Sequence, residues 1–189
     1  MELHPTIWRT CRVLAGATRI RLLKQIAAVP DLTVSRLAQS TGISLSRASQ
    51  ELRRLNARGL VQAVRISREV RYRPIPDPQV PAARPMLTAF SDTLHQTTGS
   101  PEADCRRIAS GFAHPHRVAI VHELLQRPRN AESLARVLRI PQRTIQRHLG
   151  ILHSRELIKC RQGVYTPALD RSPLVRCLAR LVKNIGSPH

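Results

Sequence analysis

Two short polar segments of the sequence carry the residue types that can recognise the edges of nucleic-acid bases. One runs from Ser44 to Arg54 and holds Ser, Arg and Gln, and the other runs from Gln142 to His148 and holds Gln, Arg, Thr and His. Arginine can pair with guanine, glutamine with adenine, and threonine can contact the methyl group of thymine. The sequence holds neither a phosphate-cradling glycine loop nor a catalytic constellation. We therefore expect binding chemistry, with no enzyme activity and no cofactor.

Both segments lie at matching places in an internal repeat. Residues Thr18–Pro74 have a degenerate copy at His116–Pro167, and the offset is 97 residues through most of the helical part, as at Leu52 and Leu149. A supersecondary unit used twice indicates two small domains. We expect the first at 1–98, with a proline-rich connector at about 74–85, and the second, with a C-terminal helix, at 99–189.

The first copy predicts one local fold. The expected elements are a helix at Thr18–Ala28, a helix at Val34–Ser40 capped by Thr33, a turn at Gly42, a third helix capped by Ser44 and ended by Gly59, and strands at Leu60–Val64 and Glu69–Arg73. Helix, helix, turn, helix and hairpin form a winged helix-turn-helix. The fold class expected is therefore mainly α with small β-hairpin wings, in tandem winged helix-turn-helix domains. The second wing, at Lys159–Thr166, is about four residues shorter.

In a winged helix-turn-helix, the helix after the turn enters the major groove of duplex DNA, and a basic wing reaches phosphates or the adjacent groove. The alternative to a DNA contact, for any single polar residue of these helices, is a side chain that is only solvated. Glu51 is expected on the same outward surface, where its carboxylate could accept from a cytosine amino group. The predicted DNA-binding residues are Ser44, Ser46, Arg47, Ser49, Gln50, Arg53, Arg54 and Arg68 in the first copy, and Gln142, Arg143, Thr144, Gln146, Arg147, His148 and Arg161 in the second.

The charge of the chain favours the same partner. There are 31 Lys and Arg residues against 12 Asp and Glu, which gives a net charge of +19. The excess is spread evenly over both halves. A GC-rich genome would explain arginine in place of lysine, but it does not explain the shortage of acids. A folded surface this basic points to a polyanion, most simply double-stranded DNA.

The sequence also predicts a location. No apolar run approaches the length of a membrane span, so no membrane partner is expected. The N-terminus lacks the charged and apolar regions of a secretion signal. The four cysteines have no paired spacing, which suits a reducing cytoplasm.

The second copy resembles the ArsR family of bacterial winged-helix repressors in the runs GFAHPHRVAIVHELL and IPQRTIQRHLGILHSRELI. The first copy matches in AGATRIRLL and GISLSRASQELRRLNARGLV, and departs where Gln50 and Glu51 replace the family's arginine–histidine pair. The resemblance implies sequence-specific binding of double-stranded DNA by a repressor-like transcriptional regulator. Because ordinary members need two chains to present two such helices, we expect this chain to act as a single-chain pseudo-dimer.

The resemblance also bears on metals. Metal-sensing ArsR proteins commonly place cysteines in the helix before the recognition helix, and the matching residues here, 34–38 and 132–137, contain none. The family pattern makes His114 and His116 turn residues. We therefore expect no metal site. Cysteines at 11, 105 and 177 are expected as inert packing, with a redox pair as the alternative.

Apolar stripes lie outside the two copies. In the ArsR family the first and last helices form the dimer interface, so the resemblance implies a homodimer through the terminal helices. The alternative is that the stripes only cap their own domains. The stripe residues are Ile7, Cys11 and Leu14 near the N-terminus, Leu87, Phe90 and Leu94 between the copies, and Leu174, Leu178, Leu181, Val182 and Ile185 near the C-terminus.

Two rival functions fit a tandem winged-helix chain. One is a structural or protein-interaction factor of the chromosome-segregation type, for which an acidic or neutral surface would be expected. The other is an architectural protein that binds DNA without sequence preference. The net charge of +19 disfavours the first. A comparison of affinity for a selected sequence and for random duplex separates the second from a regulator.

Overall fold

The computed structural model describes residues 5–95, 99–168 and 172–185. The chain divides into two compact units: a first unit, Val13–Arg106, and a second unit, Met1–Arg12 with Arg107–His189. This differs from the boundary expected between residues 98 and 99, because the N-terminal segment groups with the C-terminal half. Cys11 is fully buried in the second unit, where Cys177 is an electrostatic neighbour of its thiol. Each unit is described by itself.

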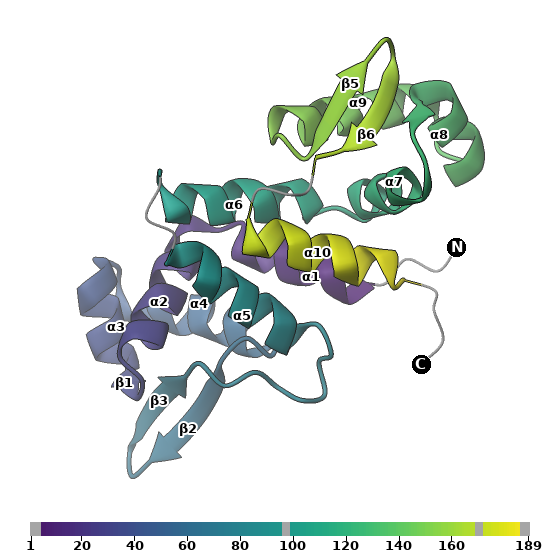
Figure 1. Cartoon of the computed structure of the whole chain (residues 1–189). Helices are drawn as coiled ribbons and strands as arrows, with labels where there is room; N and C mark the ends of the chain where they lie inside the picture. The colour runs from purple at the N-terminus through teal and green to yellow at the C-terminus, as the bar shows by residue number, and fades with distance from the viewer. Residues whose placement is uncertain (1–4, 96–98, 169–171, 186–189) are drawn as a thin grey trace. The chain divides into compact units, whose positions relative to one another are not determined.

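The helices and strands of both units are labelled in Figure 1. The first unit holds the end of α1 (Pro5–Leu14), then α2 (Ala17–Ala28), β1 (Leu32–Thr33), α3 (Val34–Thr41), α4 (Leu45–Asn56), β2 (Gln62–Ile66), β3 (Glu69–Arg73), α5 (Ala83–Leu94) and the beginning of α6 (Pro101–Phe112). The second unit holds the beginning of α1, the end of α6, then α7 (Pro115–Gln126), β4 (Arg129–Asn130), α8 (Ala131–Leu138), α9 (Gln142–Ser154), β5 (Ile158–Arg161), β6 (Val164–Pro167) and α10 (Pro173–Lys183).

Local capping sets the helix-turn-helix of the first unit. The Thr33 hydroxyl accepts from the Arg36 amide at 3.3 Å, and the Ser44 hydroxyl accepts from the Arg47 amide at 3.3 Å, so α3 and α4 each begin on an N-cap side chain. Gly42 ends α3 with a φ of 65°, which is the left-handed conformation that glycine adopts without strain. These caps and this turn confirm the sequence predictions.

The second unit builds the same turn from different residues. The Asn130 side chain accepts from the Ser133 amide at 2.8 Å and caps α8. Where the first unit has Gly42, Arg139 takes the left-handed conformation with a φ of 53°. Pro141 stands at the N-cap of α9. Because Pro141 offers no capping side chain and a left-handed arginine is strained, this turn depends more on tertiary packing than its counterpart does.

Each wing is a three-stranded antiparallel sheet rather than a simple hairpin. The strand orders are β1-β3-β2 and β4-β6-β5, and the two-residue strands β1 and β4 were not predicted. The prediction that the first wing starts at Leu60 was wrong by two residues. Leu60 and Val61 are 0% and 2% exposed and pack in the core as the chain leaves α4, and pairing begins only at Gln62, which lies opposite Arg73.

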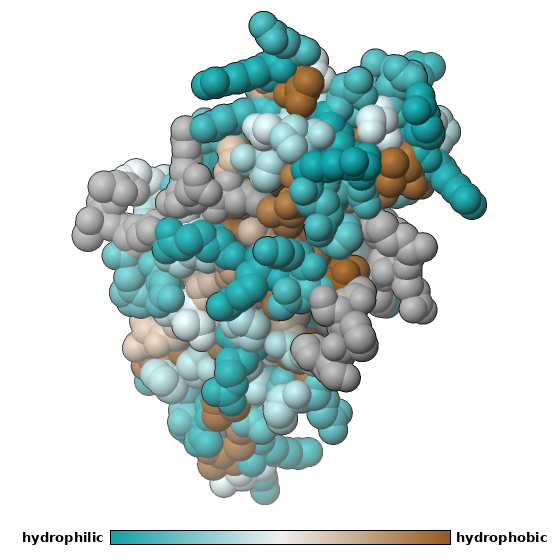
Figure 2. Space-filling model, turned by 45° about the vertical axis from the view of Figure 1, so that its right-hand side comes forward, coloured by the Kyte–Doolittle hydropathy of each residue, from teal (hydrophilic) through white to brown (hydrophobic). Residues whose placement is uncertain are grey.

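The apolar stripes predicted to form a dimer interface are largely buried within one chain. Cys11, Phe90 and Leu178 are each at most 1% exposed, and the least covered members of the stripes are half-buried. Most of each stripe is therefore covered within this chain, and a homodimer through the terminal helices stays a prediction. On the face shown in Figure 2, hydrophobic residues form separated patches among hydrophilic ones. None of the helices that the structure describes is both long and apolar enough to span a membrane.

Candidate nucleic-acid interface

The first half of α4 presents polar side chains to solvent. Ser46, Arg47 and Gln50 are exposed, and Ser49 is half-buried. Ala48 and Leu52 point into the core and are fully buried, so the helical period sends the polar positions outward. The predicted readout residues of the first unit thus share an accessible helix surface. The Ser44 hydroxyl accepts the capping hydrogen bond of α4 instead.

Two arginines near the end of α4 differ in their ion pairing. Arg53 and Arg54 are both exposed. The Arg54 guanidinium donates to Glu51 Oε1 at 3.0 Å, so part of its charge is neutralised within the unit. No ion pair is formed by Arg53 within the described part of the chain. Of the two, Arg53 is the more available to an external phosphate.

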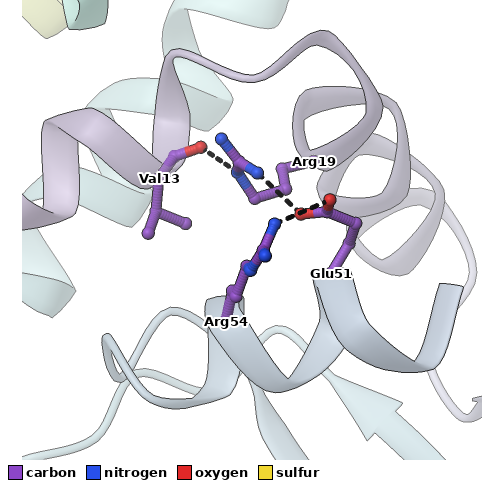
Figure 3. A network of polar contacts seen from close by, with 4 residues as sticks. All are labelled: Val13, Arg19, Glu51 and Arg54. Carbon is purple, nitrogen blue, oxygen red and sulfur yellow. Dashed lines mark hydrogen bonds and ion pairs between the residues drawn. The ribbon is translucent and has the colours of Figure 1, made fainter. Parts of the chain in front are cut away.

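Glu51 does not lie on the outward surface predicted for it, and this is a correction. The residue is 8% exposed, and Arg19 Nη1 donates to Glu51 Oε2 at 2.6 Å. Arg19 Nε in turn donates to the carbonyl of Val13, so α4 is tied through α2 to the end of α1 (Figure 3). Burial alone would raise the pKa of Glu51, but the hydrogen bond from Arg19 and the charges of Arg19 and Arg54 together lower it.

The first wing carries its cationic residues at and near the tip. Ser67, at a φ of 55°, and Arg68 connect β2 to β3, and both are exposed. Arg65 is also exposed, whereas Arg71 is paired with Glu69 at 3.0 Å. Arg68 therefore lies where the sequence placed it, and Arg65 is a neighbouring cation that was not singled out.

The first half of α9 carries two exposed arginines, whereas the first half of α4 carries one, Arg47. Gln142, Arg143, Gln146 and Arg147 are exposed, and Thr144 is half-buried. Within the described residues neither arginine takes part in an ion pair. This surface contains no acid, so its full charge faces solvent.

The prediction that His148 contacts DNA is also wrong. Its side chain is 2% exposed and cannot read a base from the solvent surface. It packs instead against two histidines at the start of α7, with ring centroids 4.4 Å from His114 and 5.3 Å from His116. Burial, then the charges of His114 and Arg117, lower the pKa of His148 to about 4. The pKa of His114 is lowered as well, again chiefly by burial. Both rings are therefore neutral at pH 7.

The second wing is short and basic. Gln162 and Gly163 form its tip, both with positive φ, between β5 and β6. Arg161 and Lys159 are exposed beside it. Arg161 thus sits where a wing residue can approach a phosphate.

The structure also brings together residues that sequence reasoning missed. Arg19 and Arg117 occupy the same position of the repeat, and each donates from Nε to a carbonyl six residues earlier, that of Val13 or of Gly111. Their neighbours on the recognition helices, Glu51 and His148, also share one repeat position and are both buried. The signal was present in the sequence, because both lie next to the apolar stripe of the helix. Their polar side chains favoured the outward interpretation.

Comparisons with known proteins agree with this architecture. Residues 16–69 match the model of the MarR family, and residues 112–161 match the model of a helix-turn-helix domain. The chain is similar to the transcriptional repressor PagR of Bacillus anthracis, with 28% identity over 100 residues that make up 52% of this chain and 99% of that protein. No solved structure matches the chain. Two winged helix-turn-helix domains therefore stand in tandem in one chain, as the sequence predicted, with a distant likeness to a bacterial repressor.

Proposed function

From the premise of two tandem winged helix-turn-helix domains, we propose that this chain is a transcriptional regulator of the repressor type that binds double-stranded DNA sequence-specifically. The observation that carries the proposal is the pair of exposed polar helix surfaces on α4 and α9, each followed by a basic wing. Base contacts in the major groove specify sequence, and wing cations position the protein on phosphates. The proposed role is binding rather than catalysis.

The two surfaces are unlike each other, which supports a single-chain pseudo-dimer. A homodimer reads a palindrome because its two recognition helices are identical. Here the exposed polar residues in the first half of α4 are Ser46, Arg47 and Gln50, whereas the first half of α9 offers Arg143 and Arg147 with two glutamines. We expect two unlike half-sites about one helical turn apart. The half-site bound by α9 should carry more of the affinity, because the first half of α9 carries two exposed arginines and the first half of α4 carries one.

The first test is salt dependence. If on the order of 6–10 phosphates are neutralised, duplex affinity should fall by roughly 10³–10⁵ between 50 and 200 mM salt. Affinity is measured by fluorescence anisotropy with a duplex selected from a random library and with random duplex. Equal affinity for the two duplexes would identify an architectural binder. Absence of binding at low salt would refute nucleic acid as the partner.

The second test separates base readout from phosphate contact. Arg147→Ala should reduce affinity for the selected duplex by about 1–3 kcal/mol and reduce it less for random duplex. Arg68→Ala should weaken both duplexes alike, because a phosphate contact carries no sequence information. Arg84→Ala removes an exposed charge from α5, outside either helix-turn-helix, and is the matched control. Equal loss on both duplexes for Arg147→Ala would contradict its assignment to base readout.

Footprinting and sedimentation test the pseudo-dimer. A monomer that protects two unlike half-sites supports it. A stable homodimer that protects a perfect palindrome through one unit only would refute it, and would make the other unit an assembly or sensing domain.

A further inference from the structure

Three imidazole rings meet at the junction of α7 and α9 in the second unit. His114 is the N-cap of α7, His116 lies in its first turn, and His148 comes from the middle of α9. One nitrogen from each ring lies within 4.8 Å of the others. The ring centroids of His114 and His116 are 4.9 Å apart, and the interplanar angle is 61°. Three histidines from two helices thus converge on one point.

The cluster contains buried polar atoms that the protein does not satisfy. Both ring nitrogens of His148, which is 2% exposed, lack a hydrogen-bond partner among the described residues, and so does Nδ1 of His116. Buried nitrogens of this kind are normally bonded, and an orphaned one points to a water molecule or an ion. Packing alone would be served as well by a leucine at position 148, without the desolvation cost of two nitrogens.

Neutral imidazole is a common ligand of zinc and related divalent ions. Three histidines with one open position form a known class of tetrahedral site, in which the metal–nitrogen distance is about 2.0–2.1 Å. Such geometry brings the ligand nitrogens to about 3.3 Å of one another, so the rings here would close in slightly. Arg117 and Arg147 contribute positive charge near His148, which disfavours a dication but also keeps the ring unprotonated.

One ligand must change its hydrogen bond to take part. His114 Nδ1 accepts from the His116 amide at 3.1 Å, so the neutral ring carries its proton on Nε2. Coordination through either nitrogen of His114 displaces this cap bond, because a ligating nitrogen has no proton and the other then carries it. An asparagine at this position keeps the N-cap but removes the imidazole.

We propose that His114, His116 and His148 form a binding site for a divalent transition-metal ion of the zinc class. This departs from the sequence-based expectation of no metal. Because His148 belongs to α9, a bound ion would cross-link α9 to the start of α7. That consequence for DNA binding rests on the proposed function, whereas the site itself does not.

The test is titration of the full chain with Co²⁺, followed by displacement with Zn²⁺. One equivalent should give visible ligand-field absorption without the near-ultraviolet band of thiolate ligation, and Zn²⁺ should abolish it. His114→Asn and His148→Leu should each weaken Co²⁺ binding at least 10-fold. His153→Asn, an exposed histidine on the same helix, is the matched control and should leave binding unchanged.

Circular dichroism of each variant verifies that it is folded, and His114→Asn keeps the test decisive if His148→Leu does not fold. Zn²⁺ should also raise the thermal midpoint of the natural chain and not that of His114→Asn, since a ligand stabilises the state it binds. Absence of stoichiometric binding, a thiolate band, or undiminished binding by His114→Asn would overturn the site. All these measurements are made without DNA, so they fail or succeed independently of the proposed function.

Discussion

Removal of Arg19 should destabilise the first unit far more than removal of Arg54, although both contact the same carboxylate. The Arg19–Glu51 pair is 2.6 Å long, and its side chains are 17% and 11% exposed. Breaking a buried ion pair by deleting one partner costs about 3–5 kcal/mol, because a charge is left buried and unpaired. Arg54 remains at 3.0 Å and compensates in part, so we expect about 2–3 kcal/mol for Arg19→Ala.

The control follows from exposure. The Arg54 side chain is 58% exposed, and exposed ion pairs contribute between about 0 and 1 kcal/mol. Arg54→Ala should therefore cost less than about 1 kcal/mol. For a unit of this size, the loss of unfolding free energy corresponds to a fall in thermal midpoint of roughly 8–24 °C for Arg19→Ala. For Arg54→Ala it corresponds to only a few degrees.

The assay is urea denaturation at pH 7, followed by circular dichroism, for both variants and for Glu51→Gln. The double variant Arg19→Ala/Glu51→Gln completes a double-mutant cycle, in which contacting residues should show a coupling energy of about 1–3 kcal/mol. Equal losses for Arg19→Ala and Arg54→Ala, or a coupling energy near zero, would refute the argument that burial makes Arg19 the dominant partner.

Three further predictions concern the same two units. Gly111→Ala should destabilise the second unit by about 1–3 kcal/mol in urea denaturation, because the added Cβ would clash with Cδ1 of the fully buried Leu157. Gly150→Ala, in open space on α9, should be neutral or stabilising by up to about 1 kcal/mol. A free-energy change of the same sign for both variants would contradict the packing around Gly111. Because the pKa of Glu51 is lowered in the folded state, this residue is protonated at a higher pH in the unfolded chain than in the folded one. The contribution of Glu51 to stability is therefore complete above the ordinary pKa of 4.5 and is lost as pH falls through the lowered pKa. Urea midpoints measured from pH 7 to 3 should decline less steeply for Glu51→Gln than for the natural chain. Asn130→Ala should cost about 0.5–2 kcal/mol through loss of the α8 cap, and a thermal midpoint equal to that of the natural chain would show that the cap bond contributes nothing.

The sequence predicts most of the helices because their signals are local. Thr33, Ser44 and Gly42 act on neighbours within a few residues, and the structure has them as cap and turn residues. The two-residue strands β1 and β4 carry no periodicity of their own and form only by pairing with β3 and β6. They could not be found from local pattern.

The candidate site was predictable only in part, for a related reason. Arg47 and Arg147 lie on the polar side of their helices, and the structure leaves both exposed. Glu51 and His148 lie beside the apolar stripe, where the helical period does not decide between core and surface. Their burial depends on partners distant in sequence, such as Arg19 for Glu51, which is 32 residues away.

The grouping of the N-terminal residues with the second unit has a consequence for the order of folding during synthesis. Domains generally fold as they emerge from the ribosome, from the N-terminal end onward. The first unit is complete once Arg106 has emerged, but Cys11 belongs to a core that also needs Cys177 of α10. The beginning of α1 is thus translated before the first unit but buried only after it. Until α10 is released, the beginning of α1 is left with unburied apolar side chains that a chaperone could bind.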